Sequence, residues 1–120
     1  MKNLSKLFLY FLIVVSVMFF SACSKADTDQ DNNVNHLIVK AKKVTKKFNL
    51  STVPMSCLIF KKLDEKFEGK VIVDVSEKHG GKCGGDPETS PRIFSIGFDE
   101  SKNEIWSDAK SLVGQMEKLN

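Results

Sequence analysis

The sequence of 120 residues has little of the chemistry that marks most active sites: two histidines, three cysteines, one tryptophan and one tyrosine. It also lacks an apolar run long enough to span a bilayer. The longest run, from Leu7 to Phe20, has 14 residues. A helix of that length covers about 21 Å, whereas the hydrocarbon core is about 30 Å thick. A permanent transmembrane helix is therefore not predicted.

The beginning of the chain is typical of an exported protein. Lys2 and Lys6 precede the apolar run, as the positive region of a secretory signal peptide does. The run ends in Phe-Ser-Ala-Cys at residues 20–23, which resembles the lipobox of bacterial lipoproteins, with phenylalanine where the family favours leucine. The resemblance implies a signal peptide over residues 1–22 and lipidation of Cys23, with palmitate or a similar acyl chain anchoring the protein in a membrane. An ordinary signal peptide with an incidental cysteine is the alternative.

The residue after this cysteine and the charge balance bear on location and partners. Ser24 resembles the pattern of Gram-negative lipoproteins sent to the outer membrane, which implies a place in the cell envelope, facing the periplasm. Removal of residues 1–22 takes away two lysines and no acid, so that 16 basic residues stand against 15 acidic ones and the net charge falls from +3 to +1. This balance does not favour nucleic acid as a partner.

The cysteines that lipidation leaves form an even pair. Cys57 and Cys83 in an oxidising compartment predict one disulfide. In the chain-entropy model, a bridge that closes about 26 residues stabilises the fold by about 3–4 kcal/mol, a large amount for a small core. A reactive or metal-binding thiol is the alternative interpretation.

Composition divides the exported chain into a tether and one domain. The polar residues from 24 to 33, SKADTDQDNN, cannot bury apolar surface, so residues 23–33 are predicted to be a lipidated cysteine followed by a flexible tether. Residues 34–119 suffice for one domain. In residues 34–48 apolar side chains recur at helical spacing and predict an amphipathic helix. Five lysines follow the other face, which we interpret as solvated, with anionic lipid or an acidic partner as the alternative: Lys40, Lys42, Lys43, Lys46 and Lys47.

The rest of the domain has the alternation of an antiparallel sheet. Strands are predicted over residues 55–62, 70–77, 92–98 and 104–107, with a charged turn, DEKFEG, between the first two. After Asp108 the apolar spacing predicts a short closing helix, which Gly114 weakens. The expected fold class is α+β: an N-terminal amphipathic helix packed on a small antiparallel sheet of about four strands, a short C-terminal helix and one disulfide.

Regular pattern is absent between Lys78 and Pro91, and any binding site is expected there. The segment, KHGGKCGGDPETSP, holds four of the seven glycines and two of the three prolines. A loop that Cys83 pins to a rigid sheet can present polar groups in a fixed arrangement. A purely structural crossover between strands is the equally weighted alternative. The candidate binding residues are His79, Lys82, Asp86, Glu88, Thr89, Ser90 and Arg92.

Sharper chemistries fail on spacing. The run GGKCGG lacks the lysine followed by serine or threonine that a phosphate-binding P-loop requires. A disulfide at Cys83 removes the thiolate that a metal site or a Cys–His nucleophile would need, which leaves His79 and Asp86 as too few ligands. Paired carboxylates such as those at residues 64–65 and 99–100 fall in predicted turns. We therefore predict no enzyme activity, no cofactor and no metal.

Two further segments of the chain have looser resemblances to known proteins. CGGDP-x-TSPR, at residues 83–92, is similar to a pattern in small exported proteins of Gram-negative bacteria that have no established activity. The strand, turn and strand from Ile96 to Trp106 also resemble the PepSY or cystatin-like class of periplasmic domains. The preferred function is a non-enzymatic binding module that meets an envelope protein or a cell-wall component through the loop. The alternatives are an accessory lipoprotein of an envelope assembly and a lysozyme inhibitor that inserts Ser90 and Arg92.

Overall fold

The computed structural model describes residues 28–120, so the predicted signal peptide and the lipidation site at Cys23 lie outside the described residues. The chain divides into two compact units, Met1–Asp31 and Asn32–Asn120, and the fold below is that of the second. The elements are the helix α2 (Thr28–Lys47), two short 3-10 turns, η2 (Met55–Cys57) and η3 (Gly81–Cys83), and the strands β1 (Leu58–Phe67), β2 (Lys70–Glu77), β3 (Arg92–Asp99), β4 (Glu104–Ser107) and β5 (Glu117–Lys118).

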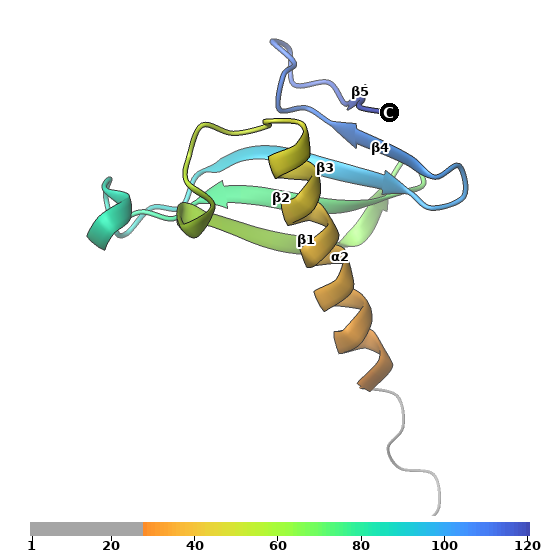
Figure 1. Ribbon diagram of the computed structural model, residues 1–120, viewed down its shortest axis with the longest axis horizontal. Coiled ribbons are helices and arrows are strands. Elements are labelled where there is room, and N and C mark those ends of the chain that lie inside the picture. The colour runs from red at the N-terminus through yellow and green to blue at the C-terminus, as the bar shows by residue number, and fades with distance from the viewer. Residues whose placement is uncertain (1–27) are drawn as a thin grey trace, which may run out of the picture. The chain divides into compact units, whose positions relative to one another are not determined.

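The strands form one antiparallel sheet in the order β1-β2-β3-β4-β5, so that each strand pairs with the next in the chain. The predicted α+β class with one disulfide is confirmed. Figure 1 shows α2 lying across one face of this sheet, with the loop that carries η3 at one end and the β3–β4 turn at the other.

The core lies between α2 and the sheet. Alternation along the central strands points Val73 and Val75 of β2 and Ile96 of β3 to the same face, where each is fully buried. Removing such side chains from water is the main favourable term in folding, about 25 cal/mol for each Å² of apolar surface. The buried core consists of Leu37, Ala41, Val44, Leu50, Leu58, Val73, Val75, Phe94, Ile96 and Phe98.

The helix begins six residues earlier than predicted. α2 starts at Thr28, so residues 28–33 are helical and the prediction of a flexible tether is wrong for them. Two physical reasons explain the extension. Once the packed turns have nucleated the helix, each further residue that is fixed adds one hydrogen bond, without the cost of a new nucleus. Acidic residues such as Asp31 also suit the positive end of a helix dipole.

At its other end α2 closes with a Schellman motif. Asn49 adopts a left-handed conformation with a φ of 50°. The Leu50 amide donates to the Thr45 carbonyl at 3.0 Å and the Asn49 amide donates to the Lys46 carbonyl at 3.4 Å. These bonds satisfy carbonyls that the helix end would leave free, and the buried Leu50 then turns the chain toward the sheet.

The first hairpin has a shorter turn than predicted. β1 begins at Leu58, after η2, and continues to Phe67, which pairs with Lys70. The turn is therefore the pair Glu68–Gly69, with φ angles of 48° and 76°. Two positive values are the signature of a type I′ turn, whose twist matches that of paired strands. Of the residues predicted to be in the turn, the first two lie in a bulge between Lys62 and Lys66, and Lys66 and Phe67 are paired with β2.

The C-terminal segment is not the predicted helix. Gly114 has a φ of 71°, and Leu112 and Val113, expected to be buried, have relative exposures of 102% and 76%. The chain instead returns to the sheet edge as β5, where the Leu119 amide donates to the Ile105 carbonyl at 2.8 Å. This fifth strand replaces the helix because a short segment with a central glycine has little helix propensity.

Candidate functional site

The loop between β2 and β3 is fastened at its base. The Glu77 amide donates to the Pro91 carbonyl at 2.9 Å, which continues the pairing of the two strands into the loop. The Lys78 amide donates to the Cys57 carbonyl at 2.7 Å. The predicted disulfide between Cys57 and Cys83 is confirmed, with the two Cα atoms 5.5 Å apart. It joins η3, at the tip, to the buried last residue of η2, directly before β1.

The histidine of the loop packs against a glycine. The φ of Gly85 is +72°, and a Cβ atom placed there would lie 2.7–2.9 Å from three atoms of the His79 ring. Only glycine allows both this backbone conformation and this close approach. The His79 side chain is consequently 16% exposed, although it belongs to a surface loop.

A chain of hydrogen bonds holds His79 in this position. Its Nδ1 atom lies 2.8 Å from Oγ1 of Thr89, and the Thr89 hydroxyl donates to the Asp86 carbonyl at 3.0 Å. Since the single hydroxyl proton is used in that second bond, Nδ1 of His79 is the donor in the first. Nε2 of His79 lies 3.7 Å from a carboxylate oxygen of Glu77. The ring therefore contacts both Thr89, within the loop, and Glu77, at its base.

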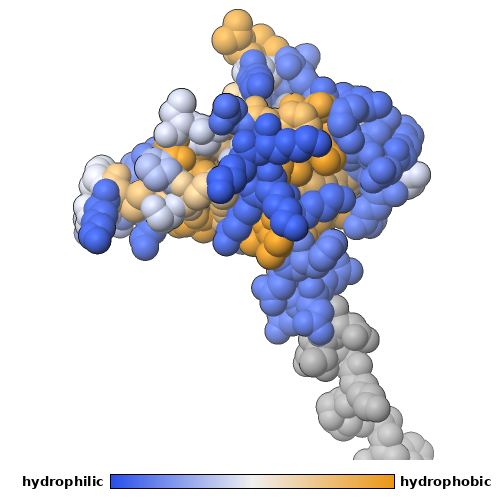
Figure 2. All heavy atoms as spheres, viewed as in Figure 1, coloured by the Kyte–Doolittle hydropathy of each residue, from blue (hydrophilic) through white to orange (hydrophobic). Residues whose placement is uncertain are grey.

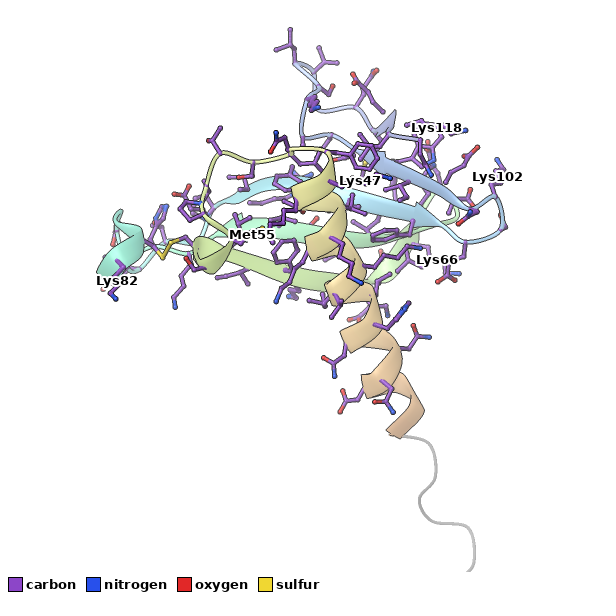
Figure 3. All side chains as sticks on the ribbon, viewed as in Figure 1. Lys47, Met55, Lys66, Lys82, Lys102 and Lys118 are labelled. Atoms are coloured by element: carbon purple, nitrogen blue, oxygen red, sulfur yellow. A yellow bond between two sulfur atoms is a disulfide. The ribbon has the colours of Figure 1, made fainter. Side chains whose placement is uncertain are left out.

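The remaining candidates fall into two groups. Asp86 accepts the Glu88 amide at 3.0 Å, and the Ser90 hydroxyl donates to the Glu77 carbonyl at 3.1 Å. Together with His79 and Thr89, they hold the loop in shape. Lys82 makes no hydrogen bond or ion pair with any residue that the structure describes, and Figure 3 shows it at the tip of the loop.

A hollow of about 550 Å³ opens beside this tip. Two lysines and His79 contribute to its lining, and no carboxylate of the described residues does. An electropositive lining without a compensating acid favours a negatively charged group. The lining residues are Ser56, Lys78, His79, Gly80, Gly81, Lys82, Cys83 and Pro87.

Arg92 lies apart from the other candidates, on the face of the sheet opposite α2. Its Nη2 atom donates to the Asp108 carboxylate at 2.5 Å and to the Ser95 hydroxyl at 2.7 Å. Its Nε atom lies 3.4 Å from the Asp74 carboxylate. The Asp108 carboxylate also accepts the Ser95 amide at 2.6 Å, and the Ser95 hydroxyl donates to Asp74. We call Asp74, Arg92, Ser95 and Asp108 the Arg92 cluster.

The Arg92 cluster raises the pKa of its arginine. Partial burial alone would lower the pKa of Arg92, but the hydrogen bond and charge of Asp108, with those of Asp74, raise the pKa above its usual value. The cluster borders a groove of about 340 Å³ whose lining also includes Leu63, Phe67 and Met116.

The partners of Arg92 were not predicted from the sequence. One signal was present, since Asp74 interrupts a run of valines in the second predicted strand. Asp74 and Ser95 are register partners across β2 and β3, on the face away from the core. Asp108, in contrast, reaches the cluster from the segment after β4, which no local pattern indicates.

Over residues 28–120, no group of three or more metal-ligating side chains comes together, and no helix is long and apolar enough to cross a membrane. Comparison with protein-family models, with curated proteins and with solved structures found no match to this chain.

Proposed function

We propose that the protein is a lipid-anchored binding module of the bacterial cell envelope and that its ligand-contacting element is the loop at residues 78–92. The observation that carries the proposal is that this loop is pre-organised. The disulfide and the bonds of His79, Thr89 and Ser90 hold its interior, and Lys82, which bonds no described residue, can contact a partner. A loop that is already rigid loses little conformational entropy on binding.

The residues that line the hollow indicate which class of partner it would bind. Lys78 and Lys82 line it and no described carboxylate does, so a carboxylate or another anion on an envelope protein or a cell-wall component suits it. The lysines are exposed, and such charges raise association rates and set specificity more than they add affinity.

Lysozyme inhibition receives less support. In that version Ser90 and Arg92 would enter an enzyme cleft. The Ser90 hydroxyl bonds the Glu77 carbonyl, and Arg92 bonds two carboxylates on the sheet face. Both residues would have to break these bonds before meeting an enzyme. An accessory role in an envelope assembly is supported by β1, an edge strand of ten residues whose outer side pairs with no strand of the described chain.

The anchor is tested by the intact mass of protein extracted from membranes, with and without reduction. A chain that starts at Cys23, carries acyl groups and gains two hydrogens on reduction is expected. The variant Cys23→Ala is expected to carry no acyl group. An unlipidated wild-type chain would remove the envelope anchor from the proposal.

The loop is tested by photo-crosslinking in intact cells, with the crosslinking residue placed at Lys82 or, as the control, at Lys102. Lys102 is also exposed and lies in the turn at the opposite end of the sheet (Figure 3). A product that forms from position 82, is absent from position 102 and decreases in the variant Lys78→Glu is expected. Identical products from both positions would contradict a loop-specific partner.

A further inference from the structure

The exposed side of α2 is basic along its C-terminal half. Leu37, Ala41 and Val44 face the core, and the lysines take the other positions of the helix. Val39, which is 50% exposed, lies among them. This lysine face consists of Lys40, Lys42, Lys43, Lys46 and Lys47. Figure 2 shows hydrophilic side chains along α2 on this side of the molecule.

Within residues 31–120, none of these lysines forms an ion pair with an acid. The ion pairs of that range use Lys70, His79, Arg92 and Lys118 as their basic partners, and none uses a lysine of α2. This separates the lysine face from the opposite sheet face, where Arg92 is paired with Asp74 and Asp108. An unpaired basic surface keeps its full attraction for an external anion.

The side chains of Lys40 and Lys42 extend from the helix to aromatic rings of the sheet. Nζ of Lys40 lies 4.9 Å from the centre of the Phe98 ring, and Nζ of Lys42 lies 5.8 Å from that of Phe60. Lys62 of β1 extends the surface further, because its register partner Val73 belongs to the core between the sheet and α2.

The earlier start of α2 shortens the connection to the predicted anchor. Only residues 24–27 separate Cys23 from the helix, in place of the ten predicted. A fully extended chain spans at most about 3.6 Å for each residue, so Thr28 cannot be more than about 18 Å from Cys23. The 20 residues of the helix extend about 30 Å. The lysine half therefore meets the bilayer surface when the helix lies along it.

We propose that the lysine face docks on anionic phospholipid headgroups of the same membrane that holds Cys23. This inference rests on the lipid anchor of the proposed function and adds an orientation to it. With α2 on the bilayer, the Arg92 cluster faces away from the membrane because it lies on the other face of the sheet. Val39 enters the headgroup region, and the lysines around it meet phosphate groups.

The expected strength follows from the charge. Each lysine near an anionic bilayer strengthens attachment about fivefold at low salt. Replacing three of them with glutamine is thus expected to weaken docking about 100-fold. The attraction decays within a Debye length, about 10 Å at 0.1 M salt, so docking is expected to disappear at high salt.

The test uses the lipidated protein in vesicles of phosphatidylethanolamine with or without phosphatidylglycerol. A membrane-impermeant amine-reactive reagent labels exposed lysines, and mass spectrometry gives the extent at each position. Lys43, Lys46 and Lys47 are expected to be labelled severalfold less when phosphatidylglycerol is present, with the difference lost in 0.5 M salt (a Debye length of about 4 Å). Lys102 and Lys61 are the internal controls, because both are exposed and Lys61 is the register partner of Asp74, on the face of the sheet away from α2.

Two variants separate docking from folding. The triple variant Lys43→Gln, Lys46→Gln, Lys47→Gln is expected to lose the protection of Lys42, whereas the double variant Lys61→Gln, Lys102→Gln is expected to keep it. Equal labelling of the lysine face in both kinds of vesicle, on protein whose mass includes the acyl chains, would overturn this inference alone. Missing acyl chains would instead overturn the anchor. Protection that appears only in cells, together with a crosslinked acidic protein, would replace lipid by that protein.

Discussion

Single residues decide the shape of the candidate loop. His79 lies over the backbone of Gly85, bonds Thr89 and approaches Glu77. Most of the polar side chains that were expected to contact a ligand bond groups of the loop itself or of its base. Such internal bonds contribute modestly to stability, about 0.5–1.5 kcal/mol each, but they fix where Lys82 points.

Replacing Gly85 with alanine is expected to lower the free energy of unfolding by about 2–5 kcal/mol. A left-handed conformation costs an alanine about 1–2 kcal/mol, and pressing a methyl group into the His79 ring adds about 1–3 kcal/mol. Gly114→Ala is the control, since Gly114 has a φ of +71° and a Cβ atom placed there would have nothing within 4 Å. Urea denaturation measures both. Equal losses would show that His79 does not pack on Gly85.

The Arg92 cluster joins three parts of the chain through side chains. Asp74 belongs to β2, Arg92 and Ser95 to β3, and Asp108 to the segment after β4. Because the guanidinium presents several donors in one plane, it bonds both carboxylates and the serine hydroxyl at once. The cluster thereby fixes the outer face of the central strands, which the helix does not cover.

At the scale of elements, the type I′ turn of the first hairpin holds an unfavourable residue. Glu68 adopts a φ of 48°, where asparagine is much better tolerated. Glu68→Asn is expected to raise the free energy of unfolding by about 0.5–1 kcal/mol. The ion pair that it removes, with Lys70, involves an exposed carboxylate and contributes little.

Thermal or urea unfolding measures the effect of Glu68→Asn. Glu100→Asn serves as the control, because Glu100 is an exposed turn residue outside the set with positive φ. A gain of the same size in both variants would indicate a general effect of removing acidic charge. It would contradict the relief of backbone strain at position 68.

Elements with a strong local pattern were predicted within a residue. The valines at 71, 73 and 75 alternate strictly, and β2 has the predicted bounds. The two ends of α2 differ in how well they could be predicted. Its C-terminus was predicted because the apolar spacing stops there, whereas residues 28–33 contain no apolar face and become helical by extension of the packed turns.

At the scale of the whole molecule, contacts distant in sequence were the hardest to predict. The disulfide followed from the cysteine count, and the loop followed from its glycines and prolines. The position of Arg92 could not be predicted in this way, because the register shifts between Val75 and Ser76 and Ser76 pairs with Arg92. Pattern along one strand contains no information on such a shift, which depends on how β2 and β3 fit together.

Charge is distributed differently on the two faces of the domain. Opposite charges are paired on the sheet face away from α2, as in Arg92 with Asp108 and Lys118 with Glu104. The lysines of α2 have no such partners among residues 28–120. Surface pairs stabilise a fold weakly, so the consequence of this division is an electrostatic polarity that orients the domain toward an anionic surface.

Acid is expected to destabilise the folded domain through the β3–β4 hairpin. The hydrogen bond from Ser101 lowers the pKa of Asp99, and the hydrogen bond from Lys118 lowers the pKa of Glu104. Both folded-state values lie below the unfolded ones, which are about 4. These carboxylates therefore stabilise the fold fully above that pH, and the stabilisation is lost as the pH falls through the lower folded-state values.

The urea midpoint, measured from pH 7 down to about pH 2.5, is expected to stay level to about pH 5 and then fall. Glu104→Gln removes one of the two shifted carboxylates, so its midpoint should be lower at pH 7 and should decline less toward acid. The control Glu100→Gln, at a glutamate that makes no ion pair within residues 28–120, should follow the wild-type curve. If Glu104→Gln declined as steeply as the wild type, the bond between Lys118 and Glu104 would not be the source of the acid sensitivity. The edge strand β5 would then depend on its backbone bonds to β4 alone.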